Sequence, residues 1–228
     1  MTPRSASVNE ELRRRSRERL LEATVEIVGE HGYEAATLGD IADRAGSARG
    51  LISYYFPGKR HLLQSAVHRL MHRSLADAMA REPVPSGPEA GDEMLARAVD
   101  TILGLARDRP VLMRAHMAGL LQQEGFIQCA EQQRLAAVLR EAVVRRGSAD
   151  PEADYPMLRA LLMGAVVALL LPGAPMPFAT LRAELLAHYG IGWERGFPPE
   201  EEPGGGTDVS DGSAAAADTP RPGHSRSV

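Results

Sequence analysis

Arg49, Ser53 and Tyr54 form the polar face of a short amphipathic segment. An arginine can donate two hydrogen bonds to the O6 and N7 atoms of guanine, a serine is small enough to allow close approach, and a tyrosine can pack on a thymine methyl group. Lys59, the only lysine of the chain, follows this segment. This position therefore does not require the two parallel donors of a guanidinium. A contact of the ammonium with a phosphate is consistent with that. The chemistry that these residues favour is recognition of double-stranded DNA.

Two short helices joined by a glycine turn are needed to present this polar face. Thr37 and Asp40 resemble a capping box at the start of the first helix, with Asp in place of the usual Glu or Gln. Gly46 ends that helix, and the second one follows directly. Ile52 and Phe56 lie one turn apart in the second helix and are predicted to face inward. The pattern is that of a helix-turn-helix.

A helix-turn-helix places its second helix in the major groove, with flanking groups on the backbone. The predicted base-reading residues are Arg49, Gly50, Ser53 and Tyr54, and the predicted phosphate-contacting residues are Thr37, Tyr55 and Lys59. In the alternative interpretation, Tyr54 and Tyr55 are packing aromatics and Thr37 serves only as a helix cap.

The rest of the chain also has helical patterns, and no segment has the pattern of a strand. Helices are predicted over residues 9–32, 59–81, 90–107, 110–122, 124–146, 151–171 and 177–190, with a stiff linker at 82–88. We therefore expect an all-α fold. Its parts are a flexible arm (1–8), a three-helix head (9–58), a connecting helix (59–81), a larger helical body (82–194) and a disordered tail (195–228).

Composition and charge fit one end of the molecule meeting phosphates. The chain has 228 residues and a net charge of −4, yet residues 1–73 hold twelve Lys and Arg against nine Asp and Glu. A mildly basic head thus joins an acidic remainder. A single cysteine, Cys129, excludes an internal disulfide framework, and the chain opens without a secretory leader pattern. We expect a cytoplasmic protein.

Residues 157–171 are apolar almost all round, which favours a buried helix. A membrane span is the competing explanation, but the stretch is short for a bilayer, contains Arg159 and ends at Pro172. Burial in a four-helix bundle across a dimer axis suits it better, with an ordinary core helix as the alternative. The predicted dimer interface consists of Leu161, Gly164, Ala165, Ala168, Phe178, Leu181, Leu185 and Tyr189.

The middle helices contain polarizable and aromatic side chains that could line an apolar cavity. The predicted ligand-binding residues are Met94, Met113, His116, Met117, Phe126 and Cys129. The alternative for each of them is ordinary core packing.

The sequence also offers residues for a thiol catalytic site and for a histidine metal site. Cys129 and His116 could form a thiol nucleophile and its base, but no oxyanion glycine motif accompanies them. His61, His68 and His72 include a four-residue step that can chelate a metal, but no acidic or cysteine partner lies nearby in the sequence. We therefore predict no enzyme activity, no metal and no cofactor.

The ordered residues of the head resemble the N-terminal signature of the tetracycline-repressor (TetR) family over about residues 12–63. The resemblance is carried by Gly32-Tyr33, Thr37, Ile41-Ala42, Ala45-Gly46, the run from Gly50 to Lys59, and Leu62. It implies a homodimer with a three-helix DNA-binding head and a ligand-binding body whose last two helices pair across a two-fold axis. In most members an inducer loosens DNA binding.

The family's contacts fall on the residues already singled out. The resemblance implies phosphate contacts at Thr37, Tyr55 and Lys59 and base contacts at Arg49, Gly50, Ser53 and Tyr54. Many members have tyrosine at the position of Ser53, and the form found here looks most like the subgroup of choline-responsive regulators.

Together these features predict a ligand-released repressor that binds a palindromic DNA operator as a homodimer and responds to a small-molecule inducer. Two alternatives remain open: a small-molecule-binding protein that retains the head as a scaffold, and a thiol hydrolase built on Cys129.

Overall fold

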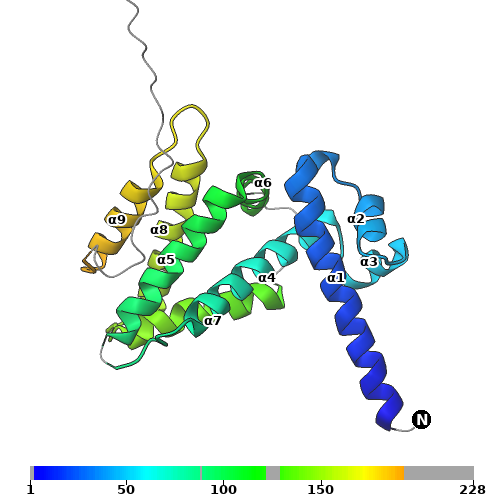
Figure 1. The fold of residues 1–228 in the computed structure, drawn as a ribbon, viewed down its shortest axis with the longest axis horizontal. Helices are drawn as coiled ribbons and strands as arrows, with labels where there is room; N and C mark the ends of the chain where they lie inside the picture. The colour runs from blue at the N-terminus through cyan, green and yellow to red at the C-terminus, as the bar shows by residue number, and fades with distance from the viewer. Residues whose placement is uncertain (1–2, 88, 122–128, 193–228) are drawn as a thin grey trace, which may run out of the picture. The chain divides into compact units, whose positions relative to one another are not determined.

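The regular elements are all helices in the computed structural model, which describes residues 3–87, 89–121 and 129–192. Their order is α1 (Pro3–Ala35), α2 (Leu38–Arg44), α3 (Arg49–Tyr55), α4 (Lys59–Ala80), α5 (Ala90–Asp108), α6 (Pro110–Leu120), α7 (Ala130–Arg145), α8 (Pro151–Leu170) and α9 (Phe178–His188) (Figure 1). The predicted all-α fold, with a three-helix head followed by a larger helical body, is confirmed.

The head is built on apolar side chains from each of its three helices. Leu20 of α1, Ile41 of α2 and Ile52 of α3 are buried, as is Phe56 directly after α3. Gly32 interrupts α1 with a φ of 80°, a conformation that favours glycine, so the predicted end of this helix coincides with a real break.

The helix α1 begins earlier than the sequence pattern indicates. An aperiodic arm was expected over residues 1–8, but the helix starts at Pro3. The segment before Asn9 has no apolar stripe from which a helix could be predicted. Arg14 pairs with Glu11 and Glu18, and Arg15 also pairs with Glu11, all within the predicted part of the helix. Such pairs, three and four residues apart, contribute to helix stability.

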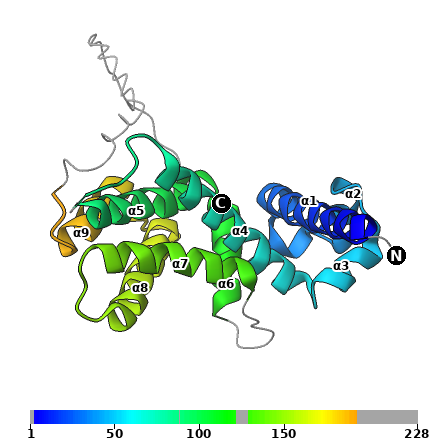
Figure 2. The ribbon, with the colours of Figure 1, turned by 90° about the horizontal axis from the view of Figure 1, so that it is seen from below.

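The connecting helix α4 contacts both the head and the body. It packs on α1 in the head and on α5, α6 and α7 in the body, and Figures 1 and 2 both show it side by side with α7. Its residues Leu62, Leu63, Val67 and Leu75 are almost fully buried. A rigid helix thus passes from the last turn of the head into the core of the body.

In the body, α5 lies at the centre and contacts α4, α6, α7, α8 and α9 (Figure 2). Gly91 lets the start of α5 touch the end of α7, because a Cβ there would lie 2.3 Å from the backbone nitrogen of Arg146. Arg146 also donates hydrogen bonds to the Asp92 carboxylate and to the carbonyl of Tyr189, both at 2.5 Å. The C-terminal end of α7 is therefore fixed to α5 and to the segment after α9.

The predicted helix boundaries in the body agree with the observed ones where Pro or Gly sets them. Pro110 and Pro151 occupy the first positions of α6 and α8. The predicted helix 124–146 differs at its start, since α7 begins at Ala130 and the side chain of Cys129 caps it. The predicted residues 124–128 and the predicted tail 195–228 lie outside the described residues.

Candidate functional site

The outer face of α3 carries the predicted base-reading residues. Arg49, Gly50, Ser53 and Tyr54 are all exposed, and 66% of the Tyr54 surface is accessible. Ile52 on the opposite face is buried. The predicted division of α3 into an inner and an outer face is therefore the observed one, and Tyr54 is not part of the core.

The guanidinium of Arg49 lies against the first turn of α2. A Cβ on Gly39 would be only 3.1 Å from Nη2 of Arg49, so the absence of a side chain at residue 39 leaves room for the guanidinium. Arg49 makes no ion pair with any described residue. Gly39 was not predicted to belong to the site. The signal in the sequence was a glycine in the first turn of α2, where a side chain would meet Arg49.

Thr37 is both a helix cap and an exposed residue at the start of α2. Its Oγ1 accepts a hydrogen bond from the amide of Asp40 at 3.1 Å, and its own amide donates to the Asp40 carboxylate at 3.1 Å. The hydrogen bonds from Thr37 and, less strongly, the charge of Arg49 lower the pKa of the Asp40 carboxyl. The predicted capping box is confirmed, with Asp serving where Glu or Gln is usual.

Tyr55 and Lys59 lie where α3 gives way to α4. Tyr55 is half-buried against the core, with its ring edge-on to that of Tyr54 at 4.9 Å between centroids. The Lys59 ammonium donates to the carbonyl of Glu34 at 3.3 Å and lies 4.3 Å from the centre of the Tyr33 ring. Lys59 thus ties the start of α4 to the end of α1.

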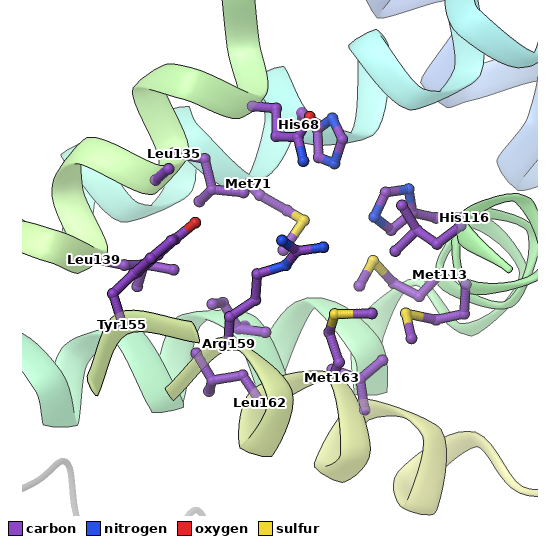
Figure 3. A pocket seen from close by; sticks show the side chains of 16 residues that line it. His68, Met71, Met113, His116, Leu135, Leu139, Tyr155, Arg159, Leu162 and Met163 are labelled. Carbon is purple, nitrogen blue, oxygen red and sulfur yellow. The ribbon is translucent and has the colours of Figure 1, made fainter. Parts of the chain in front are cut away.

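A cavity in the body is enclosed by α4, α5, α6, α7 and α8 (Figure 3). It holds about 70 Å³, which is room for a handful of water molecules. Its walls are mostly apolar with a few polar groups, and they consist of His68, Met71, Ile102, Met113, His116, Met117, Leu120, Gln132, Leu135, Ala136, Leu139, Tyr155, Arg159, Leu162, Met163 and Val166.

Two neighbouring imidazoles supply polar groups to this cavity. The rings of His68 and His116 are edge-to-face with centroids 4.9 Å apart. Burial lowers the pKa of His68 to about 4, and burial together with the His68 charge lowers the pKa of His116 to about 3. Both rings are therefore neutral at pH 7. The buried Nδ1 of His116 has no hydrogen-bond partner among the described residues.

Three of the six predicted ligand-binding residues line the cavity: Met113, His116 and Met117. Met94 is buried on α5 but does not line it, being two turns from Ile102, the α5 residue that does. Cys129 is buried behind His68, with its Sγ 3.2 Å from the Nδ1 of that ring. Phe126 lies outside the described residues.

Sequence reasoning missed the polar wall that α8 contributes, made of Tyr155 and Arg159. The signal was present, because Arg159 is a single cation within a helix that is otherwise apolar from residue 157 onward. Arg159 is exposed and also lines the cavity. Figure 3 shows its side chain between those of Met71 and Met163.

The geometry does not assemble the thiol site or the histidine metal site. Cys129 pairs with His68 rather than His116, and burial raises the pKa of its thiol, which lowers its reactivity. His61 instead packs near Phe56, with ring centroids 5.9 Å apart. No group of three His, Cys, Asp or Glu side chains suited to a metal occurs within the described residues.

A shallow groove between α8 and α9 contains six of the eight predicted interface residues: Leu161, Gly164, Ala165, Ala168, Leu181 and Leu185. The other two face their own body, since Phe178 stacks under Arg107 at 4.9 Å and Tyr189 under Arg146 at 5.2 Å. By length and composition, helix α8 could span a membrane. Only 28% of its apolar stretch is buried within the single chain. Its first turn carries Glu152 and Asp154.

Arg17 joins the head to the body beside the cavity. Its Nη1 donates to the carboxylate of Glu131, in the first turn of α7, at 2.5 Å, and its guanidinium lies 5.2 Å from the Phe56 ring centre. Glu131 is buried. Burial raises the pKa of its carboxyl, but the hydrogen bond and charge of Arg17 outweigh that effect, so the net pKa is below its usual value.

The sequence of the head is similar to that of known bacterial transcriptional regulators. Residues 20–66 match the family model described as bacterial regulatory proteins, tetR family. The chain is 34% identical over 102 residues to the HTH-type transcriptional regulator BetI 1 of Chromohalobacter salexigens, covering 45% of this chain and 50% of that protein. It is 43% identical over 68 residues to the HTH-type transcriptional repressor KstR of Mycobacterium tuberculosis, covering 30% and 31%.

These matches span half or less of the length of the curated relatives and include the head. A crystal structure of a TetR transcriptional regulator from Rhodococcus sp. RHA1 is similar over 76% of this chain and 93% of that one, with a TM-score of 0.57 and 23% identity. The fold of the head and body is therefore TetR-like, and its head carries the sequence features of tetR-type regulators.

Proposed function

We propose that this chain is a transcriptional regulator of the tetR type that binds an operator in double-stranded DNA as a homodimer and releases it when a small molecule occupies the body. The observation that carries the proposal is the exposed face of α3. There, Arg49, Ser53 and Tyr54 project from a helix whose opposite side is anchored by Ile52. The match of residues 20–66 to tetR-type regulators supports the same assignment.

In this proposal α3 lies in the major groove. Arg49 reads a guanine with its two donor groups, and Gly50 and Ser53 allow close approach of the helix. Thr37, Tyr55 and Lys59 hold phosphates on either side of the groove. The first turn of α4 suits this role because its N-cap, Gly58, provides no side-chain cap for the free amide groups.

A homodimer would present two such helices to successive half-sites about 34 Å apart on a palindromic operator. The groove between α8 and α9 supports this arrangement. Its small residues Gly164, Ala165 and Ala168 permit close approach of helices, and exposed apolar side chains such as Met157 and Val167 lie on the same helix. A partner α8 and α9 would cover this apolar surface in a four-helix bundle.

Regulation would pass from the cavity to the head through α4 and α7. His68 and Met71 of α4 and Leu135 of α7 line the cavity. The same α4 packs on α1, and the first turn of α7 is paired to α1 through Arg17 and Glu131. A ligand that displaces these residues would shift the heads and weaken operator binding. The protein would then be a ligand-released repressor, and its place of action would be the cytoplasm. The likeness to choline-responsive regulators concerns α3 alone, and we propose no choline response from it.

Footprinting on DNA adjoining the protein's own coding region tests this function. We expect a protected palindrome. Protection by Arg49→Ala should require a higher protein concentration, while the matched control Arg134→Gln, an exposed arginine on α7, should protect like the parent protein. Absence of protection on every fragment at low salt would contradict the proposal and favour a small-molecule-binding protein that keeps the head as a scaffold.

A further inference from the structure

We propose that the ligand of the body cavity is a small organic anion, a carboxylate with a short apolar chain, whose charged group is held by Arg159. This inference rests on the proposed function, because it names the ligand class of the site through which the regulator would respond. It is carried by the charges, the unpartnered polar atoms and the apolar surface of the cavity, taken in turn.

The charge of the cavity wall is positive. Arg159 is the only lining residue with a permanent charge, and no Asp or Glu side chain lines the described cavity. Arg159 makes no ion pair with any described residue. A second guanidinium lies near the wall, since Arg140 stacks on the ring of the lining residue Tyr155 at 4.4 Å. A planar guanidinium without a partner fits a carboxylate through two parallel hydrogen bonds.

The nearest buried carboxylate, that of Glu131, does not neutralise this charge. Glu131 lies outside the cavity wall and is already paired with Arg17 at 2.5 Å. The two histidines of the wall are neutral at pH 7 because burial lowers the pKa of His68 to about 4 and that of His116 to about 3. Arg159 therefore sets the sign of the ligand.

Buried polar atoms without partners mark places for ligand hydrogen bonds. His116 is 3% exposed, lines the cavity, and has no partner for its Nδ1 among the described residues. The buried Oε1 of Gln132, also in the wall, lacks a partner as well. An unsatisfied buried polar atom costs roughly 1–3 kcal/mol, so a ligand that pairs with it gains affinity.

The remaining wall suits a short apolar chain. Figure 3 shows Met71, Met113 and Met163 around the Arg159 side chain, and Met117 also lines the cavity. Methionine is flexible and polarizable, so these walls can adjust around a chain larger than the 70 Å³ of free space. An organic cation would meet a guanidinium and a single phenol ring, whereas cation sites use carboxylates or several aromatic faces.

Isothermal titration of the full-length protein with three probes, at pH 7.5 and without DNA, tests the proposal. Hexanoate, hexanamide and choline differ in charge, and the first two share their chain. We expect hexanoate to bind at least about tenfold more tightly than hexanamide, in line with the strength of charge-assisted hydrogen bonds. Choline should produce no heat of binding.

The variant Arg159→Gln should remove the preference for hexanoate over hexanamide, while the matched control Arg134→Gln should retain it. Arg159→Lys serves as a second variant and should keep the preference for the anion, because it keeps the charge. Thermal melts establish that each variant is folded. Equal binding of hexanoate and hexanamide, binding of choline, absence of hexanoate binding, or an unchanged preference in Arg159→Gln would each overturn the proposal.

The DNA experiment separates this proposal from the proposed function. A protein that binds its operator but not hexanoate would refute the ligand class alone. A protein that binds hexanoate through Arg159 but protects no DNA would refute the regulator and leave the anion site standing.

Discussion

Two basic side chains of the DNA-binding face, Arg49 and Lys59, differ in whether other groups of the protein hold them in place. The Arg49 guanidinium lies beside Gly39 and has no ion-pair partner in the part of the chain that the structure describes, whereas the Lys59 ammonium is held by the carbonyl of Glu34 and the ring of Tyr33. A free guanidinium can reorient to match a base edge. In the proposed complex, an anchored ammonium would attract the nearest DNA phosphate whatever the base sequence.

This difference predicts two kinds of loss. Lys59→Ala should weaken binding about equally for all DNA sequences and reduce the salt slope by about one unit, since one phosphate contact is lost. Arg49→Ala should cost roughly 1–3 kcal/mol and relax the preference at one base pair. Fluorescence anisotropy with operator and scrambled DNA at several salt concentrations measures both. A sequence-selective loss from Lys59→Ala would show that its assigned role is wrong.

The buried histidines predict a pH dependence of stability. An unfolded histidine binds a proton near pH 6.5, whereas His68 and His116 in the folded protein do so only near 4 and 3. The unfolded chain therefore binds more protons below pH 6.5, and stability falls as the pH is lowered through this window. Each of the two lowers the free energy of unfolding by up to about 1.4 kcal/mol per pH unit.

Urea unfolding between pH 7.5 and 5 measures this slope, in a range above the titration of most carboxyl groups. His61 and His72, whose pKa values burial also lowers, act in the same direction. His116→Met should flatten the slope, since it removes one of these groups and suits a methionine-rich wall. The control His31→Gln, at an exposed position, should leave the slope unchanged; equal slopes in His116→Met and the parent protein would contradict the assignment.

At the level of elements, Arg17 connects three parts of the fold. It lies on α1, stacks near Phe56 at the end of α3, and pairs with the buried Glu131 at the start of α7. Removing one partner of a buried ion pair leaves the other charge uncompensated, which costs about 3–5 kcal/mol. The exposed pair of Arg15 with Glu11 provides a comparison within the same helix.

We expect Arg17→Met to lower the free energy of unfolding by several times more than Arg15→Met, because exposed ion pairs contribute only about 0–1 kcal/mol. Adding Glu131→Gln to Arg17→Met should restore part of the loss, since no buried charge then remains. Urea unfolding of the single and double variants completes the cycle. Additive losses would mean that head and body are not coupled through this pair.

Sequence reasoning succeeded for elements whose ends are set by local chemistry and failed where tertiary contacts decide. Thr37 with Asp40, Pro110 and Pro151 mark helix starts because capping and ring geometry act within one turn. The N-terminal extension of α1 was missed because residues 3–8 show no apolar periodicity, which is the signal on which helix prediction depends.

The site was predictable to a similar degree. The outward face of α3 follows from helical periodicity, which places Ile52 and the polar residues on opposite sides. Half of the predicted ligand-binding residues line the cavity, because α6 carries Met113, His116 and Met117 at helical spacing. Arg159 comes from a helix distant in sequence, and its place in the cavity wall depends on how α8 packs against α5, α6 and α7. No local pattern specifies such packing.

For the whole molecule, the groove of α8 and α9 is the surface on which assembly would depend. Gly164 lies in this groove, and a Cβ built on it meets no atom within 4 Å. A larger side chain there is therefore compatible with a folded single chain but would project into the proposed dimer interface. The apolar run of residues 157–171 predicts this surface, but the sequence of one chain does not specify the geometry of a partner that would cover it.

Gly164→Arg should convert a dimer into monomers without loss of helix content, since it places a charge in an apolar interface. The control Ala183→Arg, on an exposed face of α9 outside the groove, should remain dimeric. Sedimentation equilibrium and circular dichroism measure the two properties. A monomeric parent protein at micromolar concentration, or a dimeric Gly164→Arg, would refute the proposed interface.

The close approach at Gly91 has a mechanical consequence for α7. Its C-terminal end is held by that close approach and by Arg146, while its opposite end reaches α1 through the pair of Glu131 with Arg17. A tilt of α7 about the held end would give its largest displacement at the opposite end. Pressure exerted midway, on Leu135 or Leu139, would therefore be magnified where α7 reaches Arg17, so a sub-ångström strain deep inside becomes a larger excursion at the margin of the head.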